Sequence, residues 1–572
     1  MALRPIYRLH EPVSEAVAVE LASYDPLVQQ LLYNRSIIDR ETAERFLNPD
    51  YEQHLHDPFL LTDMDRAVER ILVALAEGEH ILIYSDYDCD GIPGGVVLHD
   101  FLTALGHARF TNYIPHRHEE GYGFNAASVD QFVAKGVSLI VTVDCGITDH
   151  EAVAAAQAAG IDVIVTDHHE PGATLPGAYA VVNPKRDGSY PFPGLCGTGV
   201  AYKLAQAVLA RGRERGVVSL TEGKEKWWLD MVGVATIADM VPLQDENRVL
   251  AHYGLTVLRK SRRPGLQQLL RAAGARQSVL TEDDVGFTIG PRINAASRMD
   301  TPEDAFHLLR TTDEVEAGTY VSHLEKLNNE RKGVVAAMTR EAKKKLLQHE
   351  TLPSVIVLGN PSWRPSLVGL VAGSLAEEFS RPAFVWGRDG QGVLKGSCRS
   401  GSGVSVVTLM EATPDSFRTF GGHHASGGFS VADDAIHTLS DDLARAQETL
   451  VTTTDTGSEE CVDADLSLAD ITPALLRSLR SLAPYGVGNP KPLFRFHDVI
   501  PENVAVFGKA KNHTKLTFAL PGRAIEAIAF FKTPDQFVST LETGTPLTLI
   551  AHVEESFFMG RMQTRLRIVD VV

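Results

Sequence analysis

The sequence predicts a multidomain α/β protein with a long connecting helix and a C-terminal β-barrel. Between residues 81 and 184, short apolar runs such as ILIYSD and VSLIVTVDCG alternate with helical segments, which is typical of βαβ units that form a parallel sheet. Residues 315–349 contain no proline and are predicted to form one long, charged helix. Roughly the last hundred residues lose the helical rhythm and show successive strand-like runs, for which an OB-like barrel is the natural fold.

The chain has 572 residues, which is too long for a single hydrophobic core. We expect residues 1–314 to form the first α/β domain, with helical structure in the first 80 residues. The connecting helix at 315–349 leads to a second α/β domain at 350–450, which opens with SVIVLG and contains glycine-rich turns. Residues 431–470 are acidic and contain many serines and threonines, so they are expected to include a linker to the barrel, which is placed at 451–572.

Composition restricts the classes of function. The net charge of −19 excludes a protein that coats nucleic acid through bulk positive charge, so binding a polyanion would need a local basic groove or bound metal. No apolar run approaches the roughly 20 residues of a membrane span, and the N-terminus lacks the apolar core of a signal peptide. The five cysteines include no CxxC pair. This favours the cytoplasm, a reducing compartment, and disfavours a structural zinc site.

Acidic residues and histidines follow three of the predicted strands. The carboxyl ends of the strands in an open α/β sheet meet at one edge, where ligands bind. An aspartate after a strand is most often a turn residue or a helix cap, but three strand ends in one sheet that carry such groups are difficult to explain as caps. The residues are Asp86, Asp88 and Asp90 after ILIYS, Asp144 after VSLIVTV, and Asp167, His168 and His169 after IDVIVT.

Several aspartates at close quarters predict a bound cation, because the carboxylates otherwise repel one another. Oxygen ligands together with imidazole suit Mn²⁺ or Mg²⁺, and the number of carboxylates predicts two ions. Two such ions activate a water molecule and stabilise an in-line displacement at phosphorus. Asp239, near the end of the apolar stretch LDMVGVATIADMVPL, is a candidate fourth element. Taken alone, Asp239 is equally well explained as a helix cap or as part of a buried salt bridge.

The order of these motifs resembles that of a known group of enzymes. SDYDCDG, VTVDCG, TDHH and ATIADMVPL are similar to the four motifs of the DHH phosphoesterase superfamily, and FGGHHASGG resembles the signature of the DHH-associated domain. GPRINAASRM, YIPHRHEEGYGF and SLAPYGVGNPKPLF resemble the RecJ branch, the bacterial single-strand-specific 5′→3′ DNA exonucleases. The resemblance extends from about residue 30 to the end of the chain. It implies hydrolysis of DNA to 5′-mononucleotides in recombination and repair.

The same resemblance implies a ligand set for the two ions. Asp88 and Asp90 would each bind one ion, and Asp144 would bridge the pair. His168 and Asp239 would complete the shell of the second ion.

Four further residues near these motifs also receive roles from the resemblance. His169 would contact the scissile phosphate, while Asp86 and Asp167 would orient the groups that bind the ions, since a metal-bound histidine normally needs such a partner. Tyr84 stands where some members of the superfamily carry a histidine ligand. This departure, typical of the RecJ branch, would leave the first ion with fewer protein ligands and more water.

Arginines in two motifs are candidates for binding the DNA backbone, because the guanidinium group binds phosphate with two parallel hydrogen bonds. Arg117 lies in IPHRHEEGYG, and Arg292, Asn294 and Arg298 lie in GPRINAASR. We expect some of them to capture the terminal 5′-phosphate or the first backbone phosphates. Each one alone is as readily explained as a surface or interface arginine.

The second domain carries another candidate phosphate site. Glycine-flanked turns expose backbone N–H groups to anions, and these turns resemble the phosphate pocket of the family; a tight turn with a satisfied histidine is the structural alternative. Arg364 and Ser366 depart from the family's tryptophan-histidine-x-glycine pattern, which puts the role of that histidine in doubt here. The candidate residues are Ser397, Arg399, Ser400, His423 and His424.

The predicted barrel combines basic and aromatic residues. OB-folds bind single strands through a basic groove and aromatic stacking faces. We expect most of the phenylalanines to lie in the core and one or two to face the DNA. A ring built from both α/β domains, the long helix and the barrel would admit only a single strand. The candidates are Lys509, Lys511, Lys515, Arg561, Arg565 and Arg567, with Phe507, Phe530, Phe531 and Phe557.

Two other functions stay open from the sequence. A DHH phosphodiesterase of short oligonucleotides or cyclic dinucleotides, or a pyrophosphatase, would typically be shorter and lack the barrel. A catalytically inactive DNA-binding scaffold would be expected to have lost metal ligands, yet all five are present. The resemblance also implies partners, namely a 5′-ended single strand of DNA, a RecQ-type helicase and a single-strand-binding protein. No membrane association is expected, and we expect a monomer.

Overall fold

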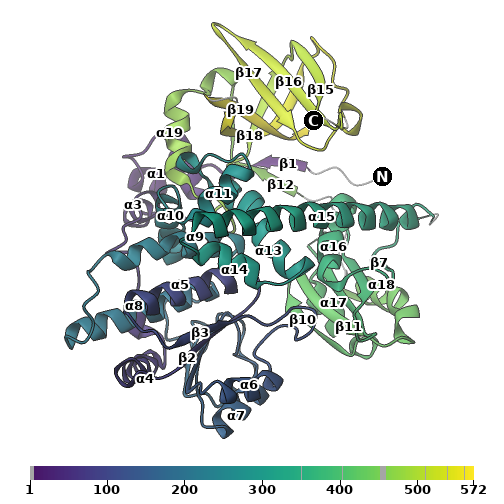
Figure 1. The fold of residues 1–572 in the computed structure, drawn as a ribbon. Helices are drawn as coiled ribbons and strands as arrows, with labels where there is room; N and C mark the ends of the chain where they lie inside the picture. The colour runs from purple at the N-terminus through teal and green to yellow at the C-terminus, as the bar shows by residue number, and fades with distance from the viewer. Residues whose placement is uncertain are drawn as a thin grey trace. The chain divides into compact units, whose positions relative to one another are not determined.

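The computed structural model describes residues 6–348, 351–401, 403–450, 459–508, 510–537, 539–558 and 561–572 (Figure 1). The chain divides into two compact units. The larger unit comprises Tyr7–Tyr113, Gly123–Gly290 and Glu460–Val572, and so combines the first α/β region with the C-terminal barrel. The smaller unit comprises residues within 114–122 and 291–459. No helix in these described ranges is long and apolar enough to cross a membrane.

A parallel five-stranded sheet forms the centre of the larger unit, as the alternating pattern predicts. Its strand order is β3-β2-β4-β5-β6, so the chain reverses its direction of travel between the neighbours β2 and β4. All residues of β2 and β4 are buried, which explains why both read as continuous apolar runs. The strands are β2 (Ile81–Ser85), β3 (Phe110–Tyr113), β4 (Leu139–Val143), β5 (Asp162–Thr166) and β6 (Ala180–Val182).

Helices cover both faces of this sheet (Figure 1). Residues of α6 and α7 share one hydrophobic cluster with β2, β4 and β5, while α4, α5 and α8 contact the sheet in a second layer. This two-sided covering confirms the expected α/β class. The helices are α4 (Met64–Glu77), α5 (Gly91–Ala104), α6 (Val129–Ala134), α7 (His150–Ala158), α8 (Gly197–Glu214), α9 (Leu229–Ala238) and α10 (Asp245–Leu258).

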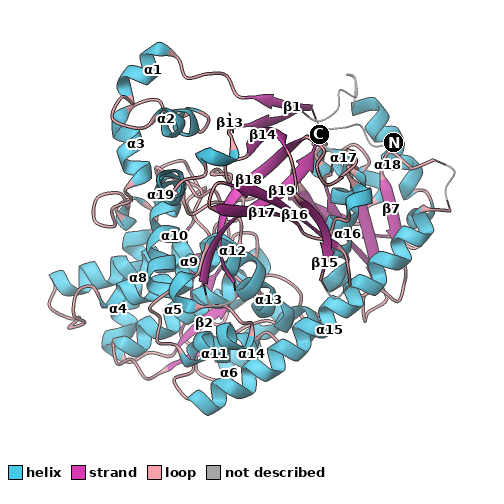
Figure 2. Cartoon of the chain, turned by 90° about the horizontal axis from the view of Figure 1, so that it is seen from above, coloured by secondary structure: helices cyan, strands magenta, loops and turns pink. Residues whose placement is uncertain are grey.

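The C-terminal region forms the expected β-barrel fold, a seven-stranded sheet of order β13-β14-β18-β19-β17-β16-β15 (Figure 2). Its core includes Phe494, Phe496 and Phe518 and also receives Leu31 and Leu32 from an N-terminal helix. The strands are β13 (Ala464–Asp465), β14 (Phe494–Val499), β15 (Asn503–Phe507), β16 (His513–Leu520), β17 (Arg523–Ala529), β18 (Leu547–Phe558) and β19 (Arg561–Val571).

The N-terminal region differs from its prediction in one element. Helices form over α1 (Glu15–Glu20), α2 (Pro26–Tyr33) and α3 (Arg40–Leu47), as expected, but Ile6–Leu9 form a strand, β1. This strand pairs with β12 (Glu459–Val462). The partner lies more than 400 residues along the chain, so no local pattern could reveal the pairing.

The smaller unit contains the long helix and a second α/β layer. The helix, α15, runs over Glu314–Leu346, and its N-cap Asp313 accepts hydrogen bonds from the backbone N–H groups of Val315 and Glu316. Residue 349 of the predicted helix lies outside the described residues. The sheet has the order β10-β11-β9-β8-β7. Its strands are β7 (Ile356–Gly359), β8 (Ala383–Arg388), β9 (Leu394–Arg399), β10 (Thr419–His423) and β11 (Ser426–Val431).

Five other α-helices complete the described part of this unit, and one of them corrects the linker prediction. Leu439, Leu443 and Ala446 recur at helical spacing and are buried in the core of the second sheet, so this acidic stretch is folded. Residues 451–458 of the expected linker lie outside the described part. The helices are α13 (Gly290–Met299), α14 (Glu303–Arg310), α16 (Pro365–Phe379), α17 (Val406–Glu411) and α18 (Leu439–Leu450).

Within the larger unit, a buried arginine joins the sheet region to the segment that precedes the barrel strands. Arg248 on α10 is 2% exposed, and its guanidinium donates to the carbonyl oxygens of Phe46, Ser481, Ala483 and Pro484 at 2.5–3.5 Å. The guanidinium also lies 3.6 Å from the centroid of the Phe46 ring. Burial lowers the pKa of Arg248, and the carbonyl oxygens take the place of the water that burial removes from its guanidinium.

Arg248→Ala should therefore destabilise the larger unit. The substitution leaves buried carbonyl groups without their donor, and each such group costs about 1–3 kcal/mol. We expect the free energy of unfolding to fall by roughly 3 kcal/mol or more, measured as a lower urea midpoint by circular dichroism. The control is Arg66→Ala, because Arg66 has a 58% exposed side chain paired with Asp63 and should change stability by less than about 0.5 kcal/mol. Equal midpoints for both variants would contradict this account.

Candidate metal centre

The acidic motifs meet where the strand order of the parallel sheet reverses. The chain leaves β2 in one direction and enters β4 on the other side, which creates a crevice at the carboxyl ends of these strands. The backbone N–H groups of Asp86, Asp144 and Asp167 extend the sheet by one residue, since they donate to the carbonyls of Val143, Thr166 and Val182. The structure therefore brings the three predicted strand ends together at one edge.

Distances within this edge define a compact group of oxygen and nitrogen atoms. His168 Nε2 lies 3.2 Å from Asp144 Oδ1 and 3.7 Å from carboxylate oxygens of both Asp90 and Asp239. Asp90, Asp144 and His168 are buried. Three groups of residues could each hold a metal ion, because the ligand atoms within each group lie within 4.8 Å of one another. These are Asp90, His168 and Asp239; Asp86, Asp88 and Asp144; and Asp144, His168 and His169.

Backbone N–H groups hold the acidic side chains in place. The carboxylate of Asp90 accepts from the N–H groups of Gly197 at 2.6 Å and Thr198 at 2.8 Å, both at the start of α8. Asp88 Oδ1 accepts from the N–H groups of Asp90 and Gly91. The start of α8 thus positions the side chain of Asp90 with two backbone donors.

The role of α8 was not foreseen from the sequence. Gly197 is required at its position, because a Cβ there would lie 2.5 Å from the Cβ of Asp144. The signal was present in the run CGTG just before an apolar helix, where the glycines allow close approach of backbone to carboxylate.

Electrostatics at this edge favour a cation. Burial, reinforced by the neighbouring aspartates, raises the pKa of Asp144 well above its ordinary value and raises the pKa of Asp239 to about 9. Asp144 and Asp239 are therefore difficult to ionise at the same time unless positive charge neutralises them. Burial also lowers the pKa of His168, which keeps its imidazole neutral and able to act as a ligand. Carboxylate oxygens with one neutral imidazole are a donor set that fits Mn²⁺ or Mg²⁺.

Asp86 and Asp167, which were predicted to have the same orienting role, differ in their surroundings. Asp86 is 3% exposed and belongs to a candidate ligand group with Asp88 and Asp144. Asp167 instead accepts hydrogen bonds from the N–H groups of Ile147, His168 and His169 and from His169 Nδ1 at 2.8 Å. Asp167 therefore fixes the ring of His169, whereas Asp86 lies among the candidate ligands.

The hydrogen bond to Asp167 also sets the charge of His169. Burial alone would lower the pKa of His169, but the bond and the charge of Asp167 outweigh burial and raise it. The same bond keeps the pKa of Asp167 below its ordinary value despite its burial.

Tyr84 lies in the core of the sheet region. Its side chain is 0% exposed and its hydroxyl donates to the carbonyl of Gly123 at 3.0 Å. The ring stacks on Tyr113 and meets Phe124 and Phe132 edge-on. The phenol is thus committed to packing, in agreement with the expectation that this position supplies no histidine-like ligand.

In the smaller unit, the glycine-rich turns lie on adjacent strands. Ser397 and Arg399 are on β9, which pairs with β11, and β11 pairs with β10, at whose end His423 lies. Ser400 donates its backbone N–H to the carbonyl of Ala425, the residue that follows His424 in the turn. The five predicted residues of this domain are therefore neighbours in space, with both histidines exposed.

Arg399 has the properties of an anion-binding residue. Burial lowers the pKa of its guanidinium, which donates to the carbonyl of Cys398 at 2.8 Å. Within the described ranges, no carboxylate lies within ion-pair distance of Arg399. Gly369 on α16 leaves room beside it, since a Cβ there would lie 3.2 Å from Arg399 Nη2 and 3.3 Å from Ser397 Oγ.

The predicted residues at 117 and 292–298 also lie in the smaller unit. Arg292 is 9% exposed and forms an ion pair with Glu325 of α15. Arg298 Nη1 donates to the carbonyl of Ser366 at 2.7 Å, and the hydroxyl of Ser366 donates back to the carbonyl of Arg298 at 2.9 Å. The serine that departs from the family pattern thus anchors Arg298, while Arg364 is the exposed N-cap of α16.

Arg117 and Asn294 are both partly exposed. The charges of Arg117 and Arg364 both help to lower the pKa of His118, after the larger effect of burial. These two arginines therefore lie close enough to His118 to form part of one basic region in the smaller unit.

The basic residues of the barrel are more often paired than the sequence suggested. Lys515 binds Glu526 at 2.9 Å, while Arg565 and Arg567 lie 3.4 and 3.6 Å from oxygens of Glu554. Lys509 lies outside the described residues.

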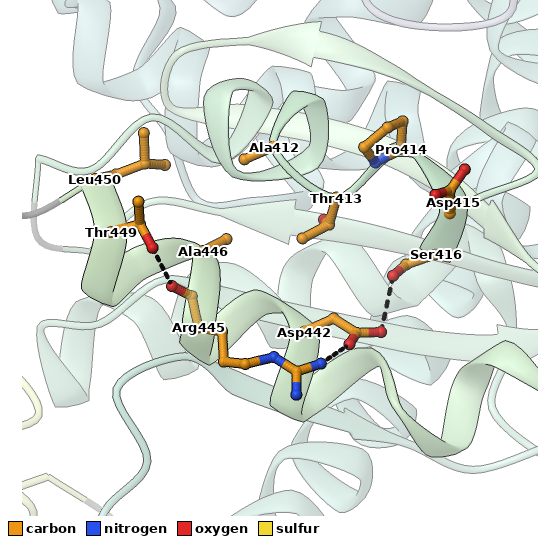
Figure 3. Close-up of a pocket in the computed structure, with 10 residues that line it drawn as sticks. All are labelled: Ala412, Thr413, Pro414, Asp415, Ser416, Asp442, Arg445, Ala446, Thr449 and Leu450. Atoms are coloured by element: carbon orange, nitrogen blue, oxygen red, sulfur yellow. Dashed lines mark hydrogen bonds and ion pairs between the residues drawn. The ribbon is translucent and has the colours of Figure 1, made fainter.

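A polar pocket in the smaller unit is separate from every predicted site residue. Figure 3 shows that Asp442 bridges Ser416 and Arg445, while Thr449 donates to the carbonyl of Arg445. These groups satisfy one another, and the pocket contains no candidate ligand or nucleophile from the motifs. Its lining residues are Ala412, Thr413, Pro414, Asp415, Ser416, Asp442, Arg445, Ala446, Thr449 and Leu450.

Comparison with known proteins agrees with this arrangement. The DHH family N-terminal domain matches residues 80–236, the DHHA1 domain matches residues 352–451, and the RecJ OB domain matches residues 462–570. The single-stranded-DNA-specific exonuclease RecJ of Bacillus subtilis is 35% identical over 95% of this chain and 68% of its own length. That of Escherichia coli is 34% identical over 83% of this chain and 84% of its own length.

Solved structures give the same result. RecJ from Thermus thermophilus in complex with Mn²⁺ aligns with a TM-score of 0.81 and 30% identity, covering 100% of this chain and 80% of that one. The Mg²⁺ complex of the same protein aligns with a TM-score of 0.75. All three domain matches and the relatives at 34–35% identity agree, and the chain belongs to the RecJ family of the DHH superfamily.

Proposed function

We propose that this chain is a single-stranded-DNA-specific 5′→3′ exonuclease that hydrolyses phosphodiester bonds with two Mn²⁺ or Mg²⁺ ions and releases 5′-mononucleotides. The observation that carries the proposal is the group of Asp90, Asp144, His168 and Asp239 at the edge of the parallel sheet. RecJ relatives that are 34–35% identical over 83–95% of this chain are named single-stranded-DNA-specific exonucleases, and solved relatives hold Mn²⁺ or Mg²⁺.

The side chains divide into those that would hold ions and those that would hold substrate. Asp88, Asp90, Asp144, His168 and Asp239 would hold the ions, and the buried Asp86 is a sixth candidate. When bound, such ions supply activation of water and neutralise charge on the phosphate.

His169 would donate a hydrogen bond to the scissile phosphate. Asp167 accepts from Nδ1 of His169, which fixes the orientation of the ring.

Arg399 and Ser397 would bind a phosphate of the strand in the smaller unit. The guanidinium of Arg399 is largely withdrawn from water and lacks a carboxylate partner among the described residues, so a phosphate would supply the missing counter-charge. Arg117, Arg298 and Asn294 would contact neighbouring phosphates. Ser400, His423 and His424 would line the same region, and Arg292 would act through its ion pair with Glu325.

The family also implies partners and a setting for this activity. We extend the proposal to cooperation with a RecQ-type helicase and a single-strand-binding protein, in recombination and repair in the cytoplasm, by a monomer. The barrel argues against a small-oligonucleotide phosphodiesterase, because such enzymes are expected to lack it. Here the barrel is present and matches the RecJ OB domain. The candidate ligands argue against an inactive scaffold, because such a protein would be expected to have lost them. Here the carboxylates and histidines of the proposed metal site are all present.

A chelator should abolish the activity, and so should Asp144→Ala. The test uses a 5′-phosphorylated, 3′-labelled single strand and a matching blunt duplex with Mn²⁺ or Mg²⁺. We expect shortening of the single strand from its 5′ end, little attack on the duplex, and a loss of about 10³-fold or more in kcat for Asp144→Ala with DNA binding retained. Asp130→Ala, at an exposed position on α6, should retain full activity.

Each alternative function gives a different result in this assay. Cleavage of only di- to tetranucleotides would favour the small-substrate phosphodiesterase. Binding without cleavage would favour the scaffold. Equal degradation of duplex and single strand would contradict strand selection.

Arg399→Ala should raise KM more than it lowers kcat. Loss of one charge-assisted phosphate contact costs about 1.5–3 kcal/mol, which corresponds to roughly 10- to 150-fold in KM. Initial rates on single strands of increasing concentration give both constants. Arg388→Ala is the matched control, because Arg388 lies in the same sheet but pairs with Asp433, and its KM should stay within about twofold of the unmodified protein. An unchanged KM for Arg399→Ala would remove Arg399 from the proposed phosphate site.

A further inference from the structure

Phe531 is an unusually exposed aromatic side chain of the barrel. It is 78% exposed and follows directly after Phe530, which is 39% exposed. Its φ angle is +56°, in the left-handed region that bulky side chains rarely adopt. Holding such a residue there costs on the order of 1–3 kcal/mol. A fold that exposes a large ring at this cost needs a specific interaction to keep it there.

His513 supplies that interaction. The backbone N–H of Phe531 donates to His513 Nδ1 at 2.8 Å. The His513 ring centroid lies 4.9 Å from that of Phe531, 5.6 Å from Phe530 and 5.2 Å from Phe507. Residues from the end of β15, the start of β16 and the end of β17 therefore form one aromatic group, and all three strands are neighbours in the sheet (Figure 2).

The histidine is itself held by close packing against the backbone. Gly508 has a φ of +91°, and a Cβ at this position would lie 2.6 Å from Cδ2 of His513. Only glycine allows this approach. The ring of His513 is thereby fixed between the β15–β16 turn and the segment that presents Phe531.

Several cations near this aromatic group are paired within the barrel, whereas Lys511 and Arg561 have no carboxylate at ion-pair distance among the described residues. Lys515 binds Glu526, Lys532 lies 3.3 Å from Asp570, and Arg565 lies 3.4 Å from Glu554. A phosphate that binds these cations must compete with the carboxylates already paired to them. The aromatic face meets no such competition, since the flat side of a ring can stack on any nucleobase.

We propose that Phe531 is a stacking platform for one nucleobase of the bound strand and that His513 is its positioning residue. This inference rests on the proposed function, since it requires that the chain binds single-stranded DNA. It adds a base contact to the basic groove expected on this barrel: the contact would not depend on sequence, and would depend little on salt.

The test compares two strands of equal length on the Asp144→Ala background, which prevents cleavage. One strand is oligo(dT), and the other is an abasic strand with the same phosphates but no bases. Fluorescence anisotropy gives Kd over a range of salt concentrations. Phe531→Ala should weaken oligo(dT) binding by roughly 5- to 150-fold, leave abasic binding unchanged, and leave the slope of log Kd against log salt unchanged.

Variants of His513 test its positioning role. His513→Leu removes the acceptor for the Phe531 N–H and should weaken oligo(dT) binding in the same way. His513→Asn keeps a side-chain acceptor near the position of Nδ1 and should restore part of the affinity. Ile500→Ala is the control, because Ile500 is 52% exposed on the same barrel but belongs to no aromatic group, and it should bind as the parent does.

A direct probe covers the case in which Phe531→Ala disturbs folding. Phe531→Trp retains a stacking face, and the fluorescence of the introduced indole should be quenched by oligo(dT) but not by the abasic strand. Equal loss of affinity for both strands in a folded Phe531→Ala variant, parent-like affinity for oligo(dT), or an indole signal insensitive to bases would each overturn the inference. Failure of the parent to bind or cleave any single strand would instead overturn the proposed function.

Discussion

The gathering of buried negative charge at the edge of the parallel sheet is the constraint on which the site depends. Asp90 and Asp144 are each nearly inaccessible to water, and burial together with mutual repulsion raises the pKa of Asp144 and of Asp239. Such a group is stable as a set of carboxylates only when positive charge compensates it. The fold supplies part of that compensation as backbone N–H groups, and a divalent cation held at this edge would supply the remainder. Cation binding and the ionisation of this edge are therefore one coupled equilibrium.

The backbone contribution explains several sequence features that look unrelated. The start of α8 must reach Asp90 closely enough for two N–H groups to donate, which leaves no space for a side chain at Gly197. Gly91 is equally constrained, since a Cβ there would lie 2.4 Å from the carbonyl oxygen of Asp86. Gly91 of SDYDCDG and Gly197 of CGTG thus both let the backbone approach an aspartate of the acidic group closely. A larger residue at either position would displace a carboxylate rather than only perturb packing.

Recognition of a polyanion by a chain of net charge −19 requires that its few uncompensated cations lie in the right places. Many arginines and lysines of this protein are paired internally, as Arg292 is with Glu325 and Lys515 with Glu526. Arg399 differs, because burial has removed water from its guanidinium without bringing a carboxylate to it among the described residues. Strand binding would then combine local phosphate contacts with stacking, and the bulk field of the protein would oppose nonspecific association.

The sequence by itself determined the α/β class, the parallel sheet and the long helix, because hydrophobic period and the absence of proline act locally along the chain. It also placed the acidic residues and histidines of three strand ends at one edge, since the carboxyl ends of parallel strands meet by geometry. Only the tertiary structure revealed the contacts between residues that lie far apart in the sequence. It paired β1 with β12, placed Ser366 against Arg298, joined α8 to Asp90, and neutralised cations that the barrel sequence shows as free. Such contacts follow from packing between segments far apart in the chain, and no local pattern encodes which charges will meet.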